Sequence, residues 1–432
     1  MKRVLIITYY WPPAGGPGVQ RWLHFVRYFK EFGIEPTVFI PANPTYPIQD
    51  EELKDLVPED IQIIKHPIKE PYALAKKLSS KKTKTLSKGI ISSESPGSIE
   101  RLLLYIRGNL FIPDARAGWV KPSVKRLSQE LDQQQYDAIV TTGPPHSLHL
   151  IGLHLKKQFK IPWLADFRDP WTNIHYHKNL RLSKRAETRH KLLEKQVLRQ
   201  ADAVVATSKH TASEFEDISG REVAVVTNGF EPVTTLEEKS SNKFVLSHLG
   251  TLLSDRNPVL LWSAIGELIK EDPVFAASFS LELYGSVSEE VMKAIVEFIP
   301  SDLVKDHGYV SHRQVLIAQR KASVLLLIEM DRPETVGIIP GKLFEYLSAE
   351  RPIIAVGPRG SEIADILTHT NAGNYFGYSD RDGIKKTLRR YFDDYKSGSV
   401  ESQIRNLKDF TRRNLTGKMS GIIDLMISET PD

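Results

Sequence analysis

The chain has 432 residues, of which 41% are hydrophobic and 26% charged, with a net charge of +5 and no cysteine. This length suffices for two α/β domains with separate cores, and the composition is that of a globular protein rather than a disordered or fibrous one. The lack of cysteine excludes disulfides, thiolate metal ligands and a cysteine nucleophile.

No stretch approaches the ~20 apolar residues of a membrane span. The first apolar run breaks at Pro12 without a small-residue cleavage site, so it predicts a strand rather than a signal peptide. We therefore expect a cytoplasmic protein.

Short β-branched or apolar runs alternate with longer amphipathic segments along nearly the whole sequence, which is typical of βαβ units. The pattern predicts a fold of the α/β class with two separate parallel sheets. The predicted strands of the first sheet are 4–8, 36–40, 61–65, 138–141, 163–166, 203–206 and 223–226. Those of the second are 244–249, 280–284, 324–328 and 352–356.

The domain boundary is predicted at a polar stretch without apolar periodicity, residues 229–242, which contains Pro232. It would join a first domain, 1–228, to a second domain, 243–410. We expect a C-terminal helix over 411–432 to pack back toward the first domain. Residues 69–96, rich in lysine and serine, predict a mobile basic insertion in that domain.

Two segments are strongly basic. Residues 76–88 hold six lysines and no acid, and residues 178–199 hold eight Lys or Arg against Glu187 and Glu194. Such segments indicate either solvated charged faces or peripheral contact with an anionic membrane surface. Neither shows a nucleic-acid-binding motif, so we expect no nucleic-acid partner.

A glycine-rich loop, with Gly15, Gly16 and Gly18, follows the first predicted strand and precedes an amphipathic helix. Glycines at such a turn let the backbone approach a ligand, and the helix N-terminus favours a negative group. A phosphate or a sugar hydroxyl fits here, and a tight turn without a ligand is the alternative. Arg21 replaces the third glycine of the dinucleotide fingerprint, so nicotinamide binding is not expected.

Polar residues follow two neighbouring strands of the first predicted sheet. His146 lies in the segment TTGPPHS, and Asp166, Arg168 and Asp169 lie in WLADFRDPW. Ligands of open α/β sheets bind beyond the carboxyl ends of the strands, so these four residues are candidate catalytic groups. The alternatives are an internal ion pair that fixes the loop and, for His146, a helix cap or a surface position.

Two segments of the second predicted domain suit a diphosphate. In LGTLLSDRNP, Gly250 ends a strand and Arg256 begins a helix, where it would supply a charged fork. In PGKLFEY, Gly341 and Lys342 open a helix that would bind phosphate, and Glu345 would accept the paired hydroxyls of a ribose. The alternatives are a solvent-exposed Arg256 and an i,i+3 ion pair between Lys342 and Glu345.

The order of these motifs resembles glycosyltransferase family 4, the retaining enzymes with the GT-B fold. In the second half LGTLLSDRNP, LYGS with Gly285, HGYVSH, ASVLLLI and PGKLFEYLSAERPIIAVGPRG follow the order of the family's donor domain. In the first half the Gly-Gly loop, DFRDPW, ADAVVATS and TNGF agree with it.

The resemblance implies two Rossmann-like domains with parallel sheets facing across a cleft, and transfer of a sugar from a nucleotide diphosphate sugar with retention of configuration. It implies no metal and no cofactor. Arg256 and Lys342 would bind the diphosphate, Glu345 the ribose, and the backbone around Tyr309 and Val310 the base.

The sequence departs from the family pattern at four positions. Arg256 stands where the family often has Lys, and Thr251 where it often has Arg. Gly337 occupies the position of an earlier glutamate, and Arg168 takes the place of a histidine. The phosphate clamp, the contact to the sugar and the handling of the acceptor are therefore expected to differ from the family pattern.

The implied activity is transfer, from a donor expected to be UDP-linked, to a glycan or lipid-linked acceptor in cell-surface polysaccharide synthesis. Such an enzyme would work in the cytoplasm, or peripherally at the inner face of the plasma membrane. The apolar residues of 102–111 predict a core helix or, alternatively, an acceptor-facing lip. The alternative functions are a GT-B sugar-nucleotide epimerase and a non-catalytic sugar-nucleotide-binding subunit of a glycan assembly complex.

Overall fold

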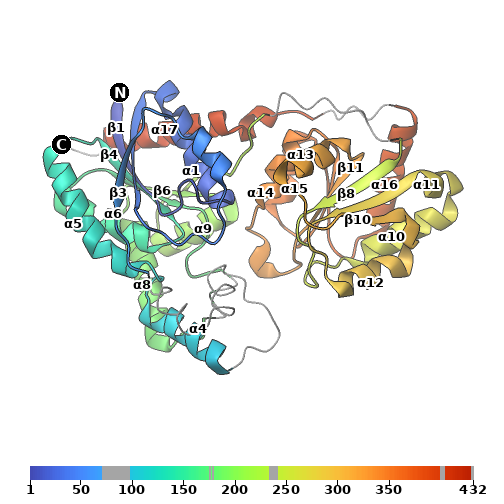
Figure 1. Cartoon of the computed structure of the whole chain (residues 1–432), viewed down its shortest axis with the longest axis horizontal. Coiled ribbons are helices and arrows are strands. Elements are labelled where there is room, and N and C mark those ends of the chain that lie inside the picture. The colour runs from blue at the N-terminus through green and yellow to red at the C-terminus, as the bar shows by residue number, and fades with distance from the viewer. Residues whose placement is uncertain (71–97, 175–176, 178–179, 233–241, 399–403, 430–432) are drawn as a thin grey trace. The chain divides into compact units, whose positions relative to one another are not determined.

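The computed structural model describes residues 1–70, 98–174, 177, 180–232, 242–398 and 404–429 (Figure 1). It divides into two compact units. Unit 1 comprises Met1–Asn228 and Arg412–Asp432, and unit 2 comprises Gly229–Thr411. The chain thus leaves unit 1, builds unit 2 and returns to unit 1 for its last helix.

Unit 1 is built on a parallel sheet whose strands, over the described residues, lie in the order β3-β2-β1-β4-β5-β6-β7. The strands are β1 (Lys2–Ile7), β2 (Ile34–Pro41), β3 (Gln62–His66), β4 (Ala138–Gly143), β5 (Trp163–Phe167), β6 (Ala203–Ala206) and β7 (Ala224–Val225). The helices are α1 (Pro17–Tyr28), α4 (Ser98–Leu110), α5 (Ala117–Gln133), α6 (Ser147–Phe159), α8 (Lys184–Gln200), α9 (Lys209–Ser219) and α17 (Arg412–Glu429).

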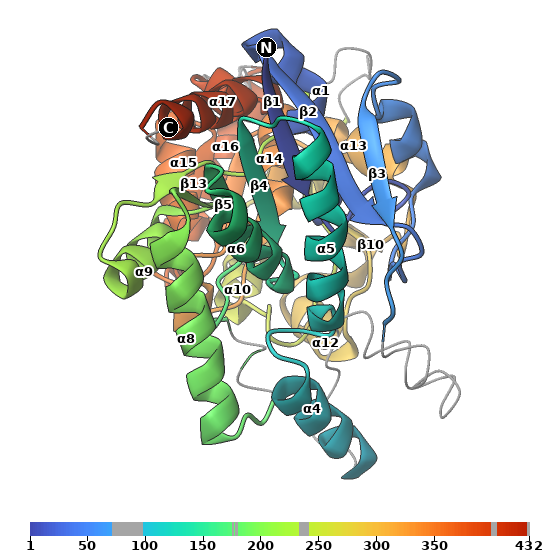
Figure 2. The same cartoon turned by 90° about the vertical axis from the view of Figure 1, so that its left-hand side faces the viewer.

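The inner strand β1 is apolar on both faces from Val4 onward, as expected for a strand covered by helices on each side. Leu5 and Ile7 face a core built with α5, α6, α8 and α9, and Figure 2 shows α5 and α6 in front of the strands. Val4 and Ile6 face the other core, where α1 and α17 pack. The last helix therefore completes the hydrophobic core of unit 1.

Unit 2 has a second parallel sheet, with the order β10-β9-β8-β11-β12-β13 among the described residues. Its strands are β8 (Phe244–Leu249), β9 (Phe279–Tyr284), β10 (Val304–Asp306), β11 (Val324–Ile328), β12 (Ile353–Val356) and β13 (Gly373–Phe376). Its helices are α10 (Val259–Glu271), α11 (Pro273–Ser278), α12 (Glu289–Phe298), α13 (His312–Lys321), α14 (Gly341–Ser348), α15 (Glu362–Thr370) and α16 (Arg381–Lys396).

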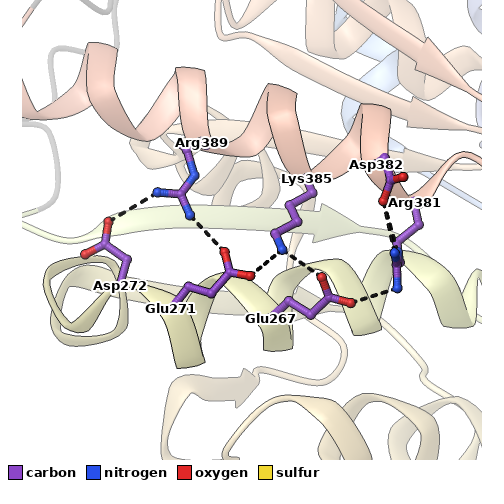
Figure 3. A network of polar contacts seen from close by, with 7 residues as sticks. All are labelled: Glu267, Glu271, Asp272, Arg381, Asp382, Lys385 and Arg389. Atoms are coloured by element: carbon purple, nitrogen blue, oxygen red, sulfur yellow. Dashed lines mark hydrogen bonds and ion pairs between the residues drawn. The ribbon is translucent and has the colours of Figure 1, made fainter.

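A surface network of ion pairs joins α10 to α16 in unit 2 (Figure 3). Lys385 lies between Glu267 and Glu271, with N···O distances of 2.7 and 2.6 Å. Arg381 and Arg389 extend the network at either side. Because these side chains are partly solvated, each ion pair of the network contributes little to the stability of unit 2.

The α/β class and the two parallel sheets predicted from the sequence are confirmed. The strand prediction omits β10 and β13, which are short edge strands. The basic residues 76–88 lie outside the described part of the chain, as do most of 69–96 and residues 233–241 of the predicted linker. Within the described residues, no helix has the length and apolar character needed to cross a membrane.

Candidate functional site

The carboxyl end of the unit 2 sheet is shaped by two glycines. Gly250 follows β8 with φ of 125°, and Gly285 follows β9 with φ of 113°, backbone conformations that favour glycine. A Cβ atom on Gly285 would lie 2.7 Å from the carbonyl oxygen of Gly250. The loop after β9 can therefore pack against the loop after β8 because Gly285 lacks a side chain.

Helix α14 places Lys342 over the first of these loops. A Cβ atom on Gly250 would lie 2.9 Å from the Lys342 Nζ atom. The helix is anchored by the buried Tyr346, whose hydroxyl accepts a hydrogen bond of 3.0 Å from the amide of Leu249. Burial lowers the pKa of Lys342, and Glu329 acts in the opposite direction. Gly341 and Lys342 thus bring the N-terminus of α14 and an amine to the end of β8.

Arg256, just before α10, meets an acid that the sequence analysis did not identify. Its Nη2 atom lies 3.6 Å from Oε2 of Glu329, the residue after β11. Glu329 is only 5% exposed. Burial raises the pKa of Glu329, while Arg256 and Lys342 lower it. The residues Arg256, Glu329 and Lys342 define a charged cluster at the carboxyl end of the sheet.

Glu345 lies one turn after Lys342 and is partly solvated. Its carboxylate accepts a hydrogen bond of 3.3 Å from Gln319 and lies 3.8 Å from the Nε2 atom of His312. The loop after β10 carries Tyr309, which is 94% exposed, and the half-buried Val310. The five other donor-site predictions lie after strands β8 and β9 and at the start of α14, so all eight lie in unit 2.

In unit 1, Asp166 is the next-to-last residue of β5 and is completely buried. Its carboxylate accepts hydrogen bonds of 2.8 Å from Arg21 Nη2, 2.7 Å from Trp22 Nε1 and 2.9 Å from the Thr142 hydroxyl. Arg21 also donates to the carbonyl of Thr227. An ion pair does fix this loop, and its cation is Arg21 rather than the neighbouring Arg168.

Arg168 connects the three loops that follow β1, β4 and β5. Its guanidinium donates to the carbonyls of Gly143, at 3.3 Å, and Pro144, and lies over the ring of Tyr10. A Cβ atom on Gly18 would lie 2.0 Å from its Nη1 atom. Because Gly18 has no side chain, the Arg168 guanidinium can lie against the backbone at that position.

Gly15 and Gly16 of the glycine-rich loop, and Asp169 after β5, have separate surroundings. Gly16 has φ of 95° at the N-terminus of α1, and the amide of Gly15 donates to the carbonyl of Ile48. Asp169 follows Arg168; burial raises the pKa of its carboxyl group and Arg168 lowers it. Of the three predicted glycines, the one that lies against Arg168 is Gly18, which the structure places in the first turn of α1.

His146 is buried and stacks on Trp171, with ring centroids 5.0 Å apart and an interplanar angle of 5°. Neither ring nitrogen has a hydrogen-bond partner among the described residues. It precedes α6 but makes no side-chain capping bond. Burial and the neighbouring His149 hold the pKa of His146 well below its usual value, so the ring is neutral.

The part of the chain that the structure describes contains no cluster of three or more residues placed to hold a metal.

Comparison with known proteins gives one family match. Residues 89–233 match the model of Glycosyltransferase Family 4. The resemblance to this family is confirmed over that segment. It covers about a third of the chain, nearly all of it in unit 1 and including Arg168 and Asp169. A search of curated proteins finds no match.

Solved structures with the same fold cover almost the whole chain. A sucrose-phosphate synthase from Thermosynechococcus elongatus is 15% identical with a TM-score of 0.59, covering 99% of this chain and 100% of that one. S. aureus TarM, in a complex that includes UDP, is 9% identical with a TM-score of 0.55 and coverage of 98% and 100%. A putative UDP-N-acetylglucosamine 2-epimerase from Listeria monocytogenes is 12% identical with a TM-score of 0.56 and coverage of 100% and 98%. At these identities the likeness establishes the GT-B fold and nothing finer.

Proposed function

We propose that the protein is a retaining glycosyltransferase that takes its sugar from a nucleotide diphosphate donor. The observation that carries the proposal is the placement of Lys342 and Arg256 at the carboxyl end of the unit 2 sheet, beside loops turned by Gly250 and Gly285. Parallel sheets bind ligands at this edge. The family match of unit 1 supports the transferase class independently.

In the proposed donor complex, Lys342, the first amides of α14 and Arg256 bind the diphosphate, because they combine fixed positive charge with hydrogen-bond donors. Glu345 accepts the ribose hydroxyls, one turn along the same helix. The exposed loop at Tyr309 and Val310 contacts the base, which we propose to be uracil.

The chemical task is to stabilise the charge that develops on the leaving diphosphate as the glycosidic bond breaks. Preorganised cations and helix amides achieve this without a metal and without a cofactor. The acceptor hydroxyl would attack on the face that the diphosphate leaves, which retains configuration. In unit 1, Arg168 is the candidate for handling the acceptor, with Asp169 beside it, since carbonyls of the loop after β4 hold its guanidinium in place.

Asp166 and His146 receive supporting roles in this proposal. The oxygens of Asp166 are occupied by Arg21, Trp22 and Thr142, so it positions the loop that carries Arg168. His146 stacks on the rings of Phe167 and Trp171, which flank the segment that carries Arg168. Both act through their neighbours and do not contact the substrate.

The acceptor is proposed to be a glycan or lipid-linked molecule of cell-surface polysaccharide synthesis. Helix α4 exposes Tyr105 and Leu110, and α8 exposes Leu192 among basic residues. Asn109 of α4 donates to the carbonyl of Arg181, just before α8, which ties the two helices together. This apolar and basic surface suits an anionic membrane or a lipid-linked acceptor, in keeping with a peripheral position at the inner face of the plasma membrane.

The test is incubation with a panel of nucleotide sugars while nucleotide release is followed with and without glycan and lipid acceptors. The proposal expects acceptor-dependent nucleotide release and a retained anomeric configuration in the product. Glu345→Ala and Arg256→Ala are expected to weaken donor binding without unfolding the protein, whereas Lys293→Ala, an exposed change on α12, serves as the control. Wild-type donor affinity in both site variants would contradict the donor-site assignment.

The fold is shared with an epimerase, so a GT-B sugar-nucleotide epimerase is the second candidate. It would act without an acceptor and would release the nucleotide together with a free sugar. A non-catalytic binding subunit would bind the nucleotide sugar and release nothing. The same assay therefore separates the three functions.

A further inference from the structure

Within the charged cluster, the buried carboxyl group of Glu329 does not use all of its hydrogen-bonding capacity. Its Oε2 atom approaches Arg256 Nη2 only to 3.6 Å, which exceeds the length of a hydrogen bond. Its Oε1 atom is buried and has no hydrogen-bond partner among the described residues, and the same holds for the Nε atom of Arg256. Both groups thus keep unused hydrogen-bonding capacity at the proposed diphosphate site.

The charged and titratable groups around Glu329 and its two cations come from several elements. Lys342 of α14 and Arg256 supply the positive charge that acts on Glu329. Of the neighbouring acids, Glu345 acts on Lys342 and Asp331 acts on Tyr378. The phenols Tyr346 of α14, Tyr375 of β13 and Tyr378 after β13 have raised pKa values and are neutral, and Tyr378 donates to the main-chain carbonyl of Glu329. His248 of β8, whose pKa is lowered to about 3, is neutral as well. Arg256 and Lys342 are therefore the cations that compensate the Glu329 carboxylate.

A diphosphate bound to Arg256 and Lys342 would compete with the Glu329 carboxylate for these two cations. It would also add negative charge beside that buried carboxylate. Like charges at short range in a buried site disfavour ionisation of both. A neutral Glu329 has the opposite effect, because its O–H can donate a hydrogen bond to a phosphate oxygen.

We propose that donor diphosphate binding to Arg256 and Lys342 is coupled to the binding of one proton by Glu329. The inference rests on the proposed donor site and assigns it a specific linkage. The proton comes from the solvent, and no covalent step is involved. Since the bound complex holds one more proton than the free protein, donor affinity decreases as the pH rises through the range in which free Glu329 ionises.

The experiment is calorimetric titration of the full chain with UDP in buffers of different ionisation enthalpy, which gives the number of protons taken up. Wild type is compared with Glu329→Gln, a neutral isostere, and with Glu297→Gln, an exposed acid of α12 that controls for net charge. UDP titrates on its own, and the difference between wild type and Glu329→Gln removes that contribution.

We expect wild type and Glu297→Gln to take up close to one proton more than Glu329→Gln. Near pH 8, Glu329→Gln should bind UDP more tightly than wild type does. The difference in affinity should be roughly tenfold for each unit by which the pH exceeds the pKa of Glu329 in the free wild-type protein. Glu329→Asp keeps a carboxyl group and should keep the extra proton. Thermal unfolding midpoints check that each variant is folded.

Equal proton uptake and equal pH dependence in wild type and Glu329→Gln would overturn the inference while leaving the donor site intact. Weaker UDP binding by Glu329→Gln with an unchanged pH dependence would overturn it too, because the ionised carboxylate itself would then favour UDP binding. Absence of UDP binding by folded wild type would instead contradict the proposed uridine-linked donor, and the inference with it.

Discussion

Arg21 Nη2 lies 2.8 Å from the Asp166 carboxylate, and both side chains are buried in unit 1. Burial alone would raise the pKa of Asp166, but its hydrogen bonds and the charge of Arg21 bring the pKa below its ordinary value. The pair joins α1 to the end of β5, so it fixes the loop that carries Arg168. Its role in the fold leads to the first prediction.

Arg21→Ala should destabilise unit 1 by about 3–5 kcal/mol, because it leaves a buried carboxylate without its charge partner. Urea unfolding followed by tryptophan fluorescence measures this, since Trp11, Trp22, Trp119, Trp163 and Trp171 all lie in unit 1. Arg413→Ala is the matched control, because the pair of Arg413 with Glu31 is exposed. An equally small effect of both variants would contradict a structural role for Arg21.

Gly18→Ala should displace the Arg168 guanidinium, because the new methyl group would lie 2.0 Å from its Nη1 atom. We expect a stability loss of about 1–3 kcal/mol and a larger fall in turnover than in donor affinity. Gly118→Ala in α5, where an added Cβ meets nothing within 4 Å, should keep full activity. Unchanged turnover in Gly18→Ala would show that the position of Arg168 does not matter for transfer.

Lys342→Met should reduce donor affinity by about tenfold to a hundredfold, as expected for the loss of a charge-assisted contact of 1.5–3 kcal/mol. The fold should persist, because Tyr346 and the apolar residues of α14 still anchor the helix. Isothermal titration with UDP measures the affinity, with Lys293→Met as a charge-matched control. Equal affinities in the two variants would remove Lys342 from the donor site.

Unit 1 should lose stability in acid because of His149, which is completely buried. Burial lowers the pKa of His149 to about 3, whereas an unfolded histidine titrates near 6.5. The folded state therefore binds fewer protons, and stability present above pH 6.5 is lost as the pH falls toward 3. At pH 5 this one residue costs about 2 kcal/mol relative to pH 7.

The measurement is the urea midpoint of tryptophan fluorescence between pH 7 and pH 5 for wild type and His149→Gln. The variant should show a smaller decrease, since glutamine does not titrate. An identical pH dependence in both proteins would mean that His149 is already protonated or is accessible in the folded state.

The alternation of apolar runs was sufficient to predict the α/β class, because strands such as β11 and β12 are buried throughout and read as continuous apolar segments. β10 was missed because it has only three residues and reads Val-Lys-Asp, which carries no period. β13 begins with Gly-Asn and lies at the sheet edge, so its sequence is that of a turn. These two edge strands depend on the neighbour that they pair with, which the local sequence does not contain, whereas the edge strands β3 and β7 of unit 1 follow apolar runs that the sequence shows.

The sequence suggested candidate residues where a residue type directly follows a strand, as for Gly250 and Arg168, or opens a helix, as for Lys342. The partner of Asp166 was not predictable in this way, because Arg21 lies 145 positions earlier and meets Asp166 only when α1 packs on the sheet. Glu329 had the required signal, since it directly follows the apolar strand β11. It was overlooked because the family pattern directs attention to the later glutamate positions.

A crystal structure of the protein with a bound nucleoside diphosphate tests the donor site most directly. The account predicts that the phosphates lie at the start of α14, in contact with Lys342 and Arg256, and that Glu345 accepts hydrogen bonds from the ribose. Phosphates bound at another part of the chain, with the Lys342 amine and the Arg256 guanidinium left without a ligand contact, would contradict it.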